Sequence, residues 1–135
     1  MRCDVVVDTS ALVALLLGEP QAETIDGLLR GSPSTSMSAA NQLELMIVVE
    51  TRAGAAGVLI AEELLRRFEI TIETVTPRIA RIAIDGWRRF GKGRHPAALN
   101  FGDCFSYALA IERTESLLFV GNDFSQTDVL RVIAA

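Results

Sequence analysis

The chain has 135 residues, of which half are hydrophobic and 22% are charged, and its net charge is −4. This composition excludes a disordered chain, a membrane-spanning protein and a protein that coats nucleic acid non-specifically. We therefore expect one soluble domain over residues 1–135. Cys3 and Cys104 have no metal-type spacing, so we expect free thiols in a reducing, cytoplasmic setting.

The first predicted element is a strand over residues 5–7 that ends at Asp8. Three consecutive valines, in place of alternation, are typical of a strand that is covered on both faces in a parallel sheet. A helical pattern begins directly after Thr9 or Ser10, and either residue could cap that helix. Asp8 is therefore expected at the carboxyl edge of the sheet, where open α/β proteins bind their ligands.

A short amphipathic helix is predicted over residues 22–31, and the polar segment 32–38 allows a second short strand. Ser38 is expected to cap a helix from residue 39 to about residue 53. This helix is apolar almost all round, so it should be deeply buried or covered by a partner. Glu44 projects from its apolar surface, although glutamate is rarely buried without a partner.

Glycines at positions 54 and 57 interrupt the pattern, and a second helix is predicted to follow them up to residue 68. Residues 70–75 alternate between apolar and polar, which predicts a strand near the sheet edge. Thr76 and Pro77 then begin a helix with a basic flank, which leads into a basic loop at residues 91–96. Six of the thirteen cationic residues lie in this span: Arg78, Arg81, Arg88, Arg89, Lys92 and Arg94.

A helix is predicted to open at Asn100 and to run to about residue 113, with Asp103 in its first turn. Residues 117–120 form another continuous apolar strand, and Asp123 follows it as Asp8 follows the first strand. A helical turn and a final edge strand at residues 131–134 complete the pattern. Strands that alternate with helices predict an α/β sandwich, in which helices flank a mostly parallel sheet of four or five strands.

Four carboxylates are expected at the carboxyl edge of this sheet: Asp8, Glu44, Asp103 and Asp123. Each has an ordinary structural explanation, since the aspartates could serve as caps or turn residues and the glutamate could pair with a buried arginine. Together, however, they would repel one another and could not all stay ionised without a cation. Oxygen ligands without histidine or cysteine favour Mg²⁺ or Mn²⁺, and such sites carry phosphoryl chemistry.

Basic residues near these acids suggest a polyanionic substrate. The residues that could hold it are Arg88, Arg89, Lys92, Arg94 and His95. Each of them could equally belong to a solvated charged surface. The chain has one histidine and no nucleophile-elbow motif, so a triad hydrolase is not supported.

The sequence resembles the PIN-domain ribonuclease toxins of VapBC modules, in order and over the whole chain. The resemblance rests on residues 7–11 (VDTSA), 38–45 (SAANQLEL), 92–110 and 117–124 (LLFVGNDF). Within the third segment, residues 102–108 (GDCFSYA) are specific to the bacterial toxin branch. The resemblance implies a three-layer PIN-like sandwich and a Mg²⁺- or Mn²⁺-dependent endoribonuclease.

The resemblance also implies roles for the four acids, which match the acidic quartet of the family. Asp8 and Asp103 would be metal ligands, and Glu44 would hold a second metal or position the attacking water. Asp123 would complete the pocket, with Asn122 and Asp128 close enough to compete for that role. Ser10, or Thr9, matches a hydroxyl next to the first aspartate, and we add Ser10 to the residues expected to contact RNA.

Members of this family usually form homodimers and are silenced by a cognate VapB antitoxin, whose C-terminal segment occupies a groove and sends a basic side chain toward the acids. Residues expected to line the groove or the dimer seam are Leu45, Met46, Val49, Val58 and Leu59. Two alternatives stay open: an inactive PIN fold that only binds, and a phosphoacceptor receiver domain. The receiver domain needs a lysine at a strand end, whereas the only lysine is Lys92 in a loop.

Overall fold

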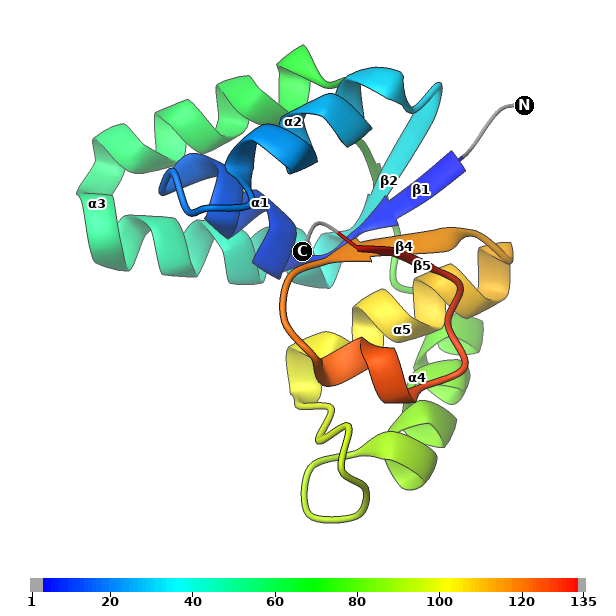
Figure 1. Cartoon of the computed structure of the whole chain (residues 1–135). Coiled ribbons are helices and arrows are strands. Elements are labelled where there is room, and N and C mark those ends of the chain that lie inside the picture. The colour runs from blue at the N-terminus through cyan, green and yellow to red at the C-terminus, as the bar shows by residue number, and fades with distance from the viewer. Residues whose placement is uncertain (1–3, 134–135) are drawn as a thin grey trace.

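The computed structural model describes residues 4–133, and no helix within them is long and apolar enough to cross a membrane. The strands of the single parallel sheet are β1 (Asp4–Val7), β2 (Ser34–Ser38), β3 (Thr71–Glu73), β4 (Ser116–Phe119) and β5 (Arg131–Ile133). The helices are α1 (Thr9–Leu16), α2 (Ala22–Gly31), α3 (Ala39–Arg67), α4 (Pro77–Phe90), α5 (Phe101–Arg113) and the short 3₁₀ helix η1 (Asp123–Gln126). Helices cover both faces of the sheet (Figure 1), which confirms the predicted three-layer α/β sandwich.

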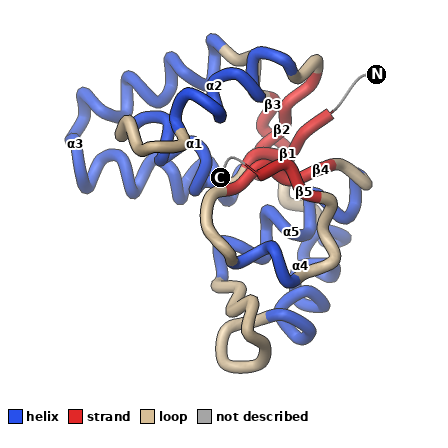
Figure 2. The backbone as a smooth tube through the Cα atoms, in the orientation of Figure 1, coloured by secondary structure: helices blue, strands red, loops and turns tan. Residues whose placement is uncertain are grey.

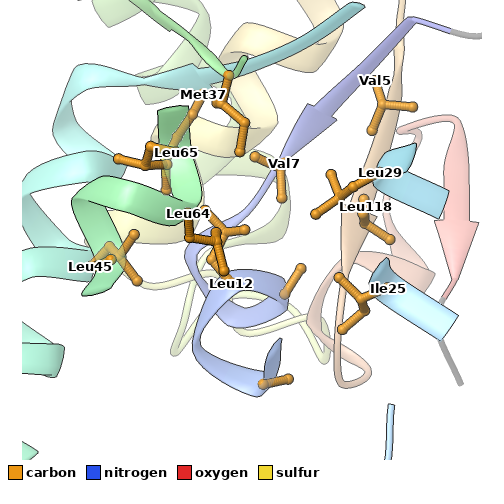
Figure 3. Packing of buried hydrophobic residues seen from close by; sticks show 14 of the residues in the cluster. Val5, Val7, Leu12, Ile25, Leu29, Met37, Leu45, Leu64, Leu65 and Leu118 are labelled. Atoms are coloured by element: carbon orange, nitrogen blue, oxygen red, sulfur yellow. The ribbon is translucent and has the colours of Figure 1, made fainter. Parts of the chain in front are cut away.

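The sheet has the strand order β3-β2-β1-β4-β5, so β1 lies at its centre. Val5 and Val7 face the layer of α1, α2 and α3 (Figure 3), while Val6 packs into the layer of α4 and α5. Figure 2 shows the sheet between these two groups of helices. The continuous valine run is therefore explained by burial on both faces. The β3 strand lies at one edge and β5 at the other, as their sequences predicted.

Helix α3 bends sharply at Gly54, which has the non-helical angles φ 68° and ψ −164°. The chain doubles back there (Figure 1), so the predicted interruption between two helices is confirmed. Gly57 lies beyond the bend and approaches the first arm closely, because a Cβ at this position would lie 2.9 Å from Cγ1 of Val49. The second arm then returns Leu64 and Leu65 to the same core as Leu45 (Figure 3).

Capping side chains begin most of the helices. Ser38 caps α3 through the N–H of Ala40, and Thr76 caps α4 through the N–H of Ile79, both as predicted. The prediction that Thr9 or Ser10 caps the first helix is wrong, because the side chain of Asp8 itself accepts from the N–H of Ser10. A strand-end aspartate in an extended conformation can serve as the N-cap directly, which leaves both hydroxyls free for other contacts.

Of the two cysteines, Cys3 lies outside the described residues, and Cys104 is a buried free thiol. Burial, and then the nearby Asp103 carboxylate, raise the pKa of Cys104 to about 11. The thiol therefore stays protonated at neutral pH and behaves as a small apolar side chain.

Candidate active site

The predicted acids lie where elements from four parts of the chain meet at the carboxyl edge of the sheet. Asp8 joins β1 to α1, Glu44 lies in the second turn of α3, and Asp103 lies in the first turn of α5. Asp123 begins η1, just beyond the end of β4. Parallel strands bring all their carboxyl ends to one edge, which explains why residues so distant in sequence come together.

Asp8 is almost fully buried. Its Oδ2 accepts the N–H of Ser10 at 3.0 Å, and its Oδ1 accepts the hydroxyl of Ser106 at 2.5 Å. Burial raises the pKa of Asp8, the hydrogen bonds from Ser10 and Ser106 oppose that rise, and the Glu44 carboxylate adds to it. Asp8 is thus held rigidly in a place that disfavours its negative charge.

Asp103 shares a capping box with Asn100. The N–H of Asn100 donates to Asp103 Oδ2 at 3.0 Å, and the N–H of Asp103 donates to Asn100 Oδ1 at 2.9 Å. Burial raises the pKa of Asp103 to about 7. The hydrogen bond from Asn100 lowers this pKa, while the charges of Asp8, Asp123 and Glu44 raise it further. The ordinary capping role and the acidic cluster are therefore both present at this residue.

Glu44 is half-buried and lines a surface hollow of about 420 Å³ between α3 and the start of α5. Its Oε1 accepts from the amide of Asn41 at 3.2 Å. Among residues 4–133, no arginine or lysine forms an ion pair with it, so the alternative of a buried arginine partner does not hold for this part of the chain. Glu44 thus contributes to the uncompensated negative charge of the site.

Two residues that sequence reasoning missed, Asn41 and Ser106, connect the acids. Both are fully buried. The Ser106 hydroxyl lies 3.0 Å from Asn41 Oδ1 as well as next to Asp8 Oδ1, so its one proton faces two acceptors. Thr9 Oγ1 donates to the backbone carbonyl of Asn41 at 3.1 Å. The signal in the sequence is spacing, because each residue lies one helical turn from an acid on the same helix face.

The site suits a hard divalent cation by its chemistry, because it offers carboxylate oxygens, and a cation would offset the burial and repulsion that disfavour the negative charges of Asp8 and Asp103. In the present side-chain conformations, no three acidic, histidine or cysteine side chains within residues 4–133 are placed to share one ion. Asp8 and Asp103 are instead turned toward Ser106 and Asn100.

The three residues considered for the last acidic position have different surroundings. Asp128 accepts from the Tyr107 hydroxyl at 2.9 Å and pairs with Arg89 at 3.2 Å. Asn122 precedes η1 at its N-cap position, and its side chain makes no capping hydrogen bond. The charge of Asp123 acts on Asp103 and raises its pKa. Asp123 therefore belongs to the acidic cluster by its charge, whereas Asp128 holds the side chains of Tyr107 and Arg89 in place.

Several residues expected to contact RNA have partners within the chain. Ser10 Oγ accepts the N–H of Val120 at 3.0 Å and so ties the start of α1 to the segment that follows β4. Arg89 donates to Tyr107 and Asp128. His95 Nδ1 accepts the N–H of Ala97 at 3.0 Å, and its ring packs edge-on against Phe90.

The remaining basic residues are more available. Arg94 stacks over Trp87, with 4.8 Å between its guanidinium carbon and the ring centroid, and donates to the backbone carbonyl of Arg88. Both Arg94 and Lys92 are exposed, in the loop that leads into α5. The side chains of Arg88, Lys92 and Arg94 form none of the ion pairs found within residues 4–133. These three side chains thus keep their charge available to solvent.

The apolar surface differs from the predicted one. Leu45 and Val49, expected at a groove or dimer seam, are buried in the core, and that expectation is wrong for them. Leu43 and Ile47 are exposed by 62% and 57% instead, because they lie on the opposite face of the same helix. Met46 and Val58 are partly buried, and Leu59 is exposed as expected.

An exposed aromatic side chain marks the edge of this apolar surface. Phe101, the first residue of α5, is 81% exposed and packs edge-on against Phe105. These two residues line both the hollow that contains Glu44 and a second hollow, of about 440 Å³, between α4 and α5. Apolar surface thus borders the acidic cluster directly.

Comparison with known proteins gives a consistent result. A family model described as PIN domain matches residues 5–130. The chain is 46% identical to Ribonuclease VapC of Mycolicibacterium smegmatis over 127 residues, which cover 94% of this chain and 98% of that protein.

Solved structures share the fold. One is VapC20 of Mycobacterium tuberculosis, described as a sarcin-ricin loop cleaving toxin, with a TM-score of 0.78 at 22% identity, covering 95% of this chain and 98% of that one. Another is VapBC-5 of the same organism, described as a member of the VapBC family of toxin-antitoxin systems. It has a TM-score of 0.68 at 18% identity and covers 97% of both chains.

Proposed function

The chain belongs to the PIN-domain family, and from this premise we propose that it is a Mg²⁺- or Mn²⁺-dependent endoribonuclease, the toxin of a type II toxin–antitoxin pair that a VapB-type antitoxin neutralises. The observation that carries the proposal is the meeting of Asp8, Glu44 and Asp103 at one sheet edge, where burial and the neighbouring carboxylates disfavour the negative charges of Asp8 and Asp103. The similarity to a VapC ribonuclease over nearly the whole chain supports it.

In this proposal Asp8 and Asp103 would hold the cation, with Glu44 and Asp123 beside them. A divalent cation bound there would activate a water molecule and stabilise the charge on the phosphate during in-line displacement. Hydrogen bonds within the chain orient these carboxylates. The Ser10 N–H and the Ser106 hydroxyl orient Asp8, and the capping box with Asn100 orients Asp103. The Glu44 carboxylate would accept a proton from the attacking water.

The basic loop before α5 would hold the RNA backbone. Arg88, Lys92 and Arg94 carry charge that no ion pair within the described part of the chain uses. Phosphate groups of RNA would be attracted to these cations and held near an edge that would otherwise repel them. Ser10, Arg89 and His95 would act indirectly, since their polar atoms already hold strand ends and loops in place.

The same negative charge explains how an antitoxin could silence the site. A basic side chain inserted among Asp8, Glu44 and Asp103 would compensate the carboxylates in place of a metal ion. The exposed apolar residues around Phe101 would bury the rest of such a segment or a second copy of the chain. We accordingly expect a homodimer and a VapB-type partner.

The test is cleavage of RNA by the purified chain, with Mg²⁺ or Mn²⁺ and then with EDTA. We expect cleavage only with the metal, and the variant Asp8→Asn should lose at least about a hundredfold in rate while keeping its circular dichroism spectrum. Cleavage that persists in EDTA or in Asp8→Asn would contradict the metal mechanism. Absence of any cleavage by the metal-loaded wild-type chain would favour an inactive PIN fold that only binds. A cognate VapB-type antitoxin should stop the cleavage when added.

A further inference from the structure

The carboxylate of Glu44 is held on one side by the amide of Asn41. The Nδ2 group of Asn41 donates to Glu44 Oε1 at 3.2 Å and also to the backbone carbonyl of Gly102 at 3.0 Å. Asn41 has no exposed surface, so water does not compete for these hydrogen bonds. One buried amide therefore joins the first turns of α3 and α5 at the place where Glu44 approaches Asp103.

On its other side the carboxylate lies against the Cα of Gly102. A Cβ on Gly102 would lie 2.8 Å from Cδ of Glu44 and 2.9 Å from Oε1, and it would be closer still to Oε2. These distances are shorter than van der Waals contact. The carboxylate thus occupies the space that a side chain at position 102 would need.

The backbone of Gly102 gives no other reason for a glycine. The glycines with positive φ in the described residues are Gly18, Gly54, Gly93 and Gly121. Gly102 lies in the first turn of α5, where alanine is accommodated and usually preferred. Glycine at position 102 therefore makes room for the Glu44 carboxylate and is not required by the backbone angles.

We propose that Asn41 and Gly102 are positioning residues that hold the Glu44 carboxylate beside the first turn of α5, within the acidic cluster. The inference rests on the proposed function, because Glu44 matters there only if the cluster binds a cation. Asp8 and Asp103 repel Glu44, and its half-exposed side chain has an open hollow into which it could turn. Without the hydrogen bond and the vacant space, the carboxylate would move away from the other acids and into solvent.

The variant Gly102→Ala tests this directly. The added methyl group should displace the far end of the Glu44 side chain, while alanine in the helix offsets the cost to the fold. We expect the rate of RNA cleavage to fall at least about tenfold, and the rise in Tm caused by Mn²⁺ to shrink, with Tm in EDTA held within about 3 °C of the wild type. The Tm readout does not depend on activity.

Gly27→Ala is the matched control. Gly27 is an exposed helical glycine in α2, and a Cβ there would meet nothing within 4 Å. This variant should raise Tm by about 1 to 3 °C and leave both cleavage and the Mn²⁺ effect unchanged. The comparison separates the general effect of alanine in a helix from the effect of a methyl group placed against Glu44.

A second experiment asks whether the effect of Gly102→Ala depends on the presence of Glu44. In a Glu44→Ala background, Gly102→Ala should behave like Gly27→Ala and cause no further loss of the Mn²⁺-induced shift in Tm. Asn41→Ala should likewise reduce that shift in the wild-type chain but not in the Glu44→Ala chain.

Three results would overturn the inference, and they are distinguishable from one another. Equal effects of Gly102→Ala with and without Glu44, or unchanged cleavage and an unchanged Mn²⁺ response in Gly102→Ala, would overturn the inference alone. A wild-type chain that neither cleaves RNA nor responds to Mn²⁺ would overturn the proposed function, and this inference with it.

Discussion

Asp103 belongs both to the cap of α5 and to the acidic cluster. Its carboxylate accepts the N–H of Asn100, which stabilises the first turn of the helix. Its pKa is nonetheless raised to about 7, first by burial and then by the charges of Asp8, Asp123 and Glu44. Burial thus favours the neutral form of Asp103 in the metal-free fold, whereas the proposed metal site would require its charged form.

The stability of the metal-free chain should therefore depend on pH through Asp103. An acid whose pKa is higher in the folded state than its ordinary value of 3.8 stabilises the fold fully below about pH 4, and this contribution is lost as the pH rises through about 7. Asp103→Asn keeps an acceptor for Asn100 but cannot ionise. We expect it to be more stable than the wild type by roughly 1 to 3 kcal/mol at pH 8 in EDTA, and much less so at pH 5.

Thermal unfolding at the two pH values measures this difference. RNA cleavage by Asp103→Asn should be lost at both, because a neutral amide is a poor ligand for a hard cation. A stability difference between variant and wild type that is the same at pH 5 and pH 8 would show that Asp103 does not titrate in this range.

Helix α3 places Glu44 by means of its two arms. The first arm carries Asn41 and Glu44 at the carboxyl edge of the sheet, and the second arm returns after the bend at Gly54. The second arm buries Ala61, Leu64 and Leu65 against the core that also receives Leu45. This packing stabilises the first arm in its position through burial of apolar surface.

The bend needs glycine because its backbone angles, φ 68° and ψ −164°, are strained for any side chain. A Cβ at Gly54 would meet nothing within 4 Å, so Gly54→Ala should destabilise the fold only through its backbone. We expect a loss of about 1 to 3 kcal/mol in the free energy of unfolding, measured by urea denaturation. Gly27→Ala is again the control, and it should be slightly stabilising. Equal stability of the two variants would mean that the bend does not need glycine.

Across the whole molecule, the basic residues are unevenly distributed along the chain. The net charge is −4, yet a basic span leads from α4 into the loop before α5, close in sequence to Asp103. A cation such as Lys92 is exposed there, whereas Arg66 on the second arm of α3 pairs with Glu63 at 2.8 Å. Only the first of these positions is expected to contact a nucleic acid.

Removal of a phosphate contact should change how salt affects binding. We expect Lys92→Ala to weaken RNA binding and to lower the slope of log K against log salt by about one unit, because fewer counterions are released. Arg66→Ala removes one charge from a different surface and should leave that slope unchanged. Fluorescence anisotropy with labelled RNA at several salt concentrations measures both slopes, and both variants are made in the Asp8→Asn chain, which is expected not to cleave the RNA. Equal slopes for the two variants would place the RNA elsewhere.

Local sequence features determined most of the fold and the identity of the acids. The valine run before Asp8 reflects a strand buried on both faces, and the caps Ser38, Thr76 and Asn100 mark helix starts because their hydrogen bonds join residues two or three positions apart. Glu44 could be recognised because a carboxylate on an apolar surface needs an explanation. These features depend on near neighbours along the chain, so they can be recognised without the tertiary structure.

The tertiary structure alone decided which polar groups meet. The hydrogen bond from Ser106 to Asp8 joins residues 98 positions apart, and that from Asn41 to the carbonyl of Gly102 joins residues 61 positions apart. No local pattern encodes such pairs, because they depend on how α3 and α5 pack against the sheet. The same packing buries Leu45 and leaves Leu43 exposed, although both are leucines in one apolar helix. The two leucines lie on opposite faces of α3, and only the packing of the core decides which face is buried.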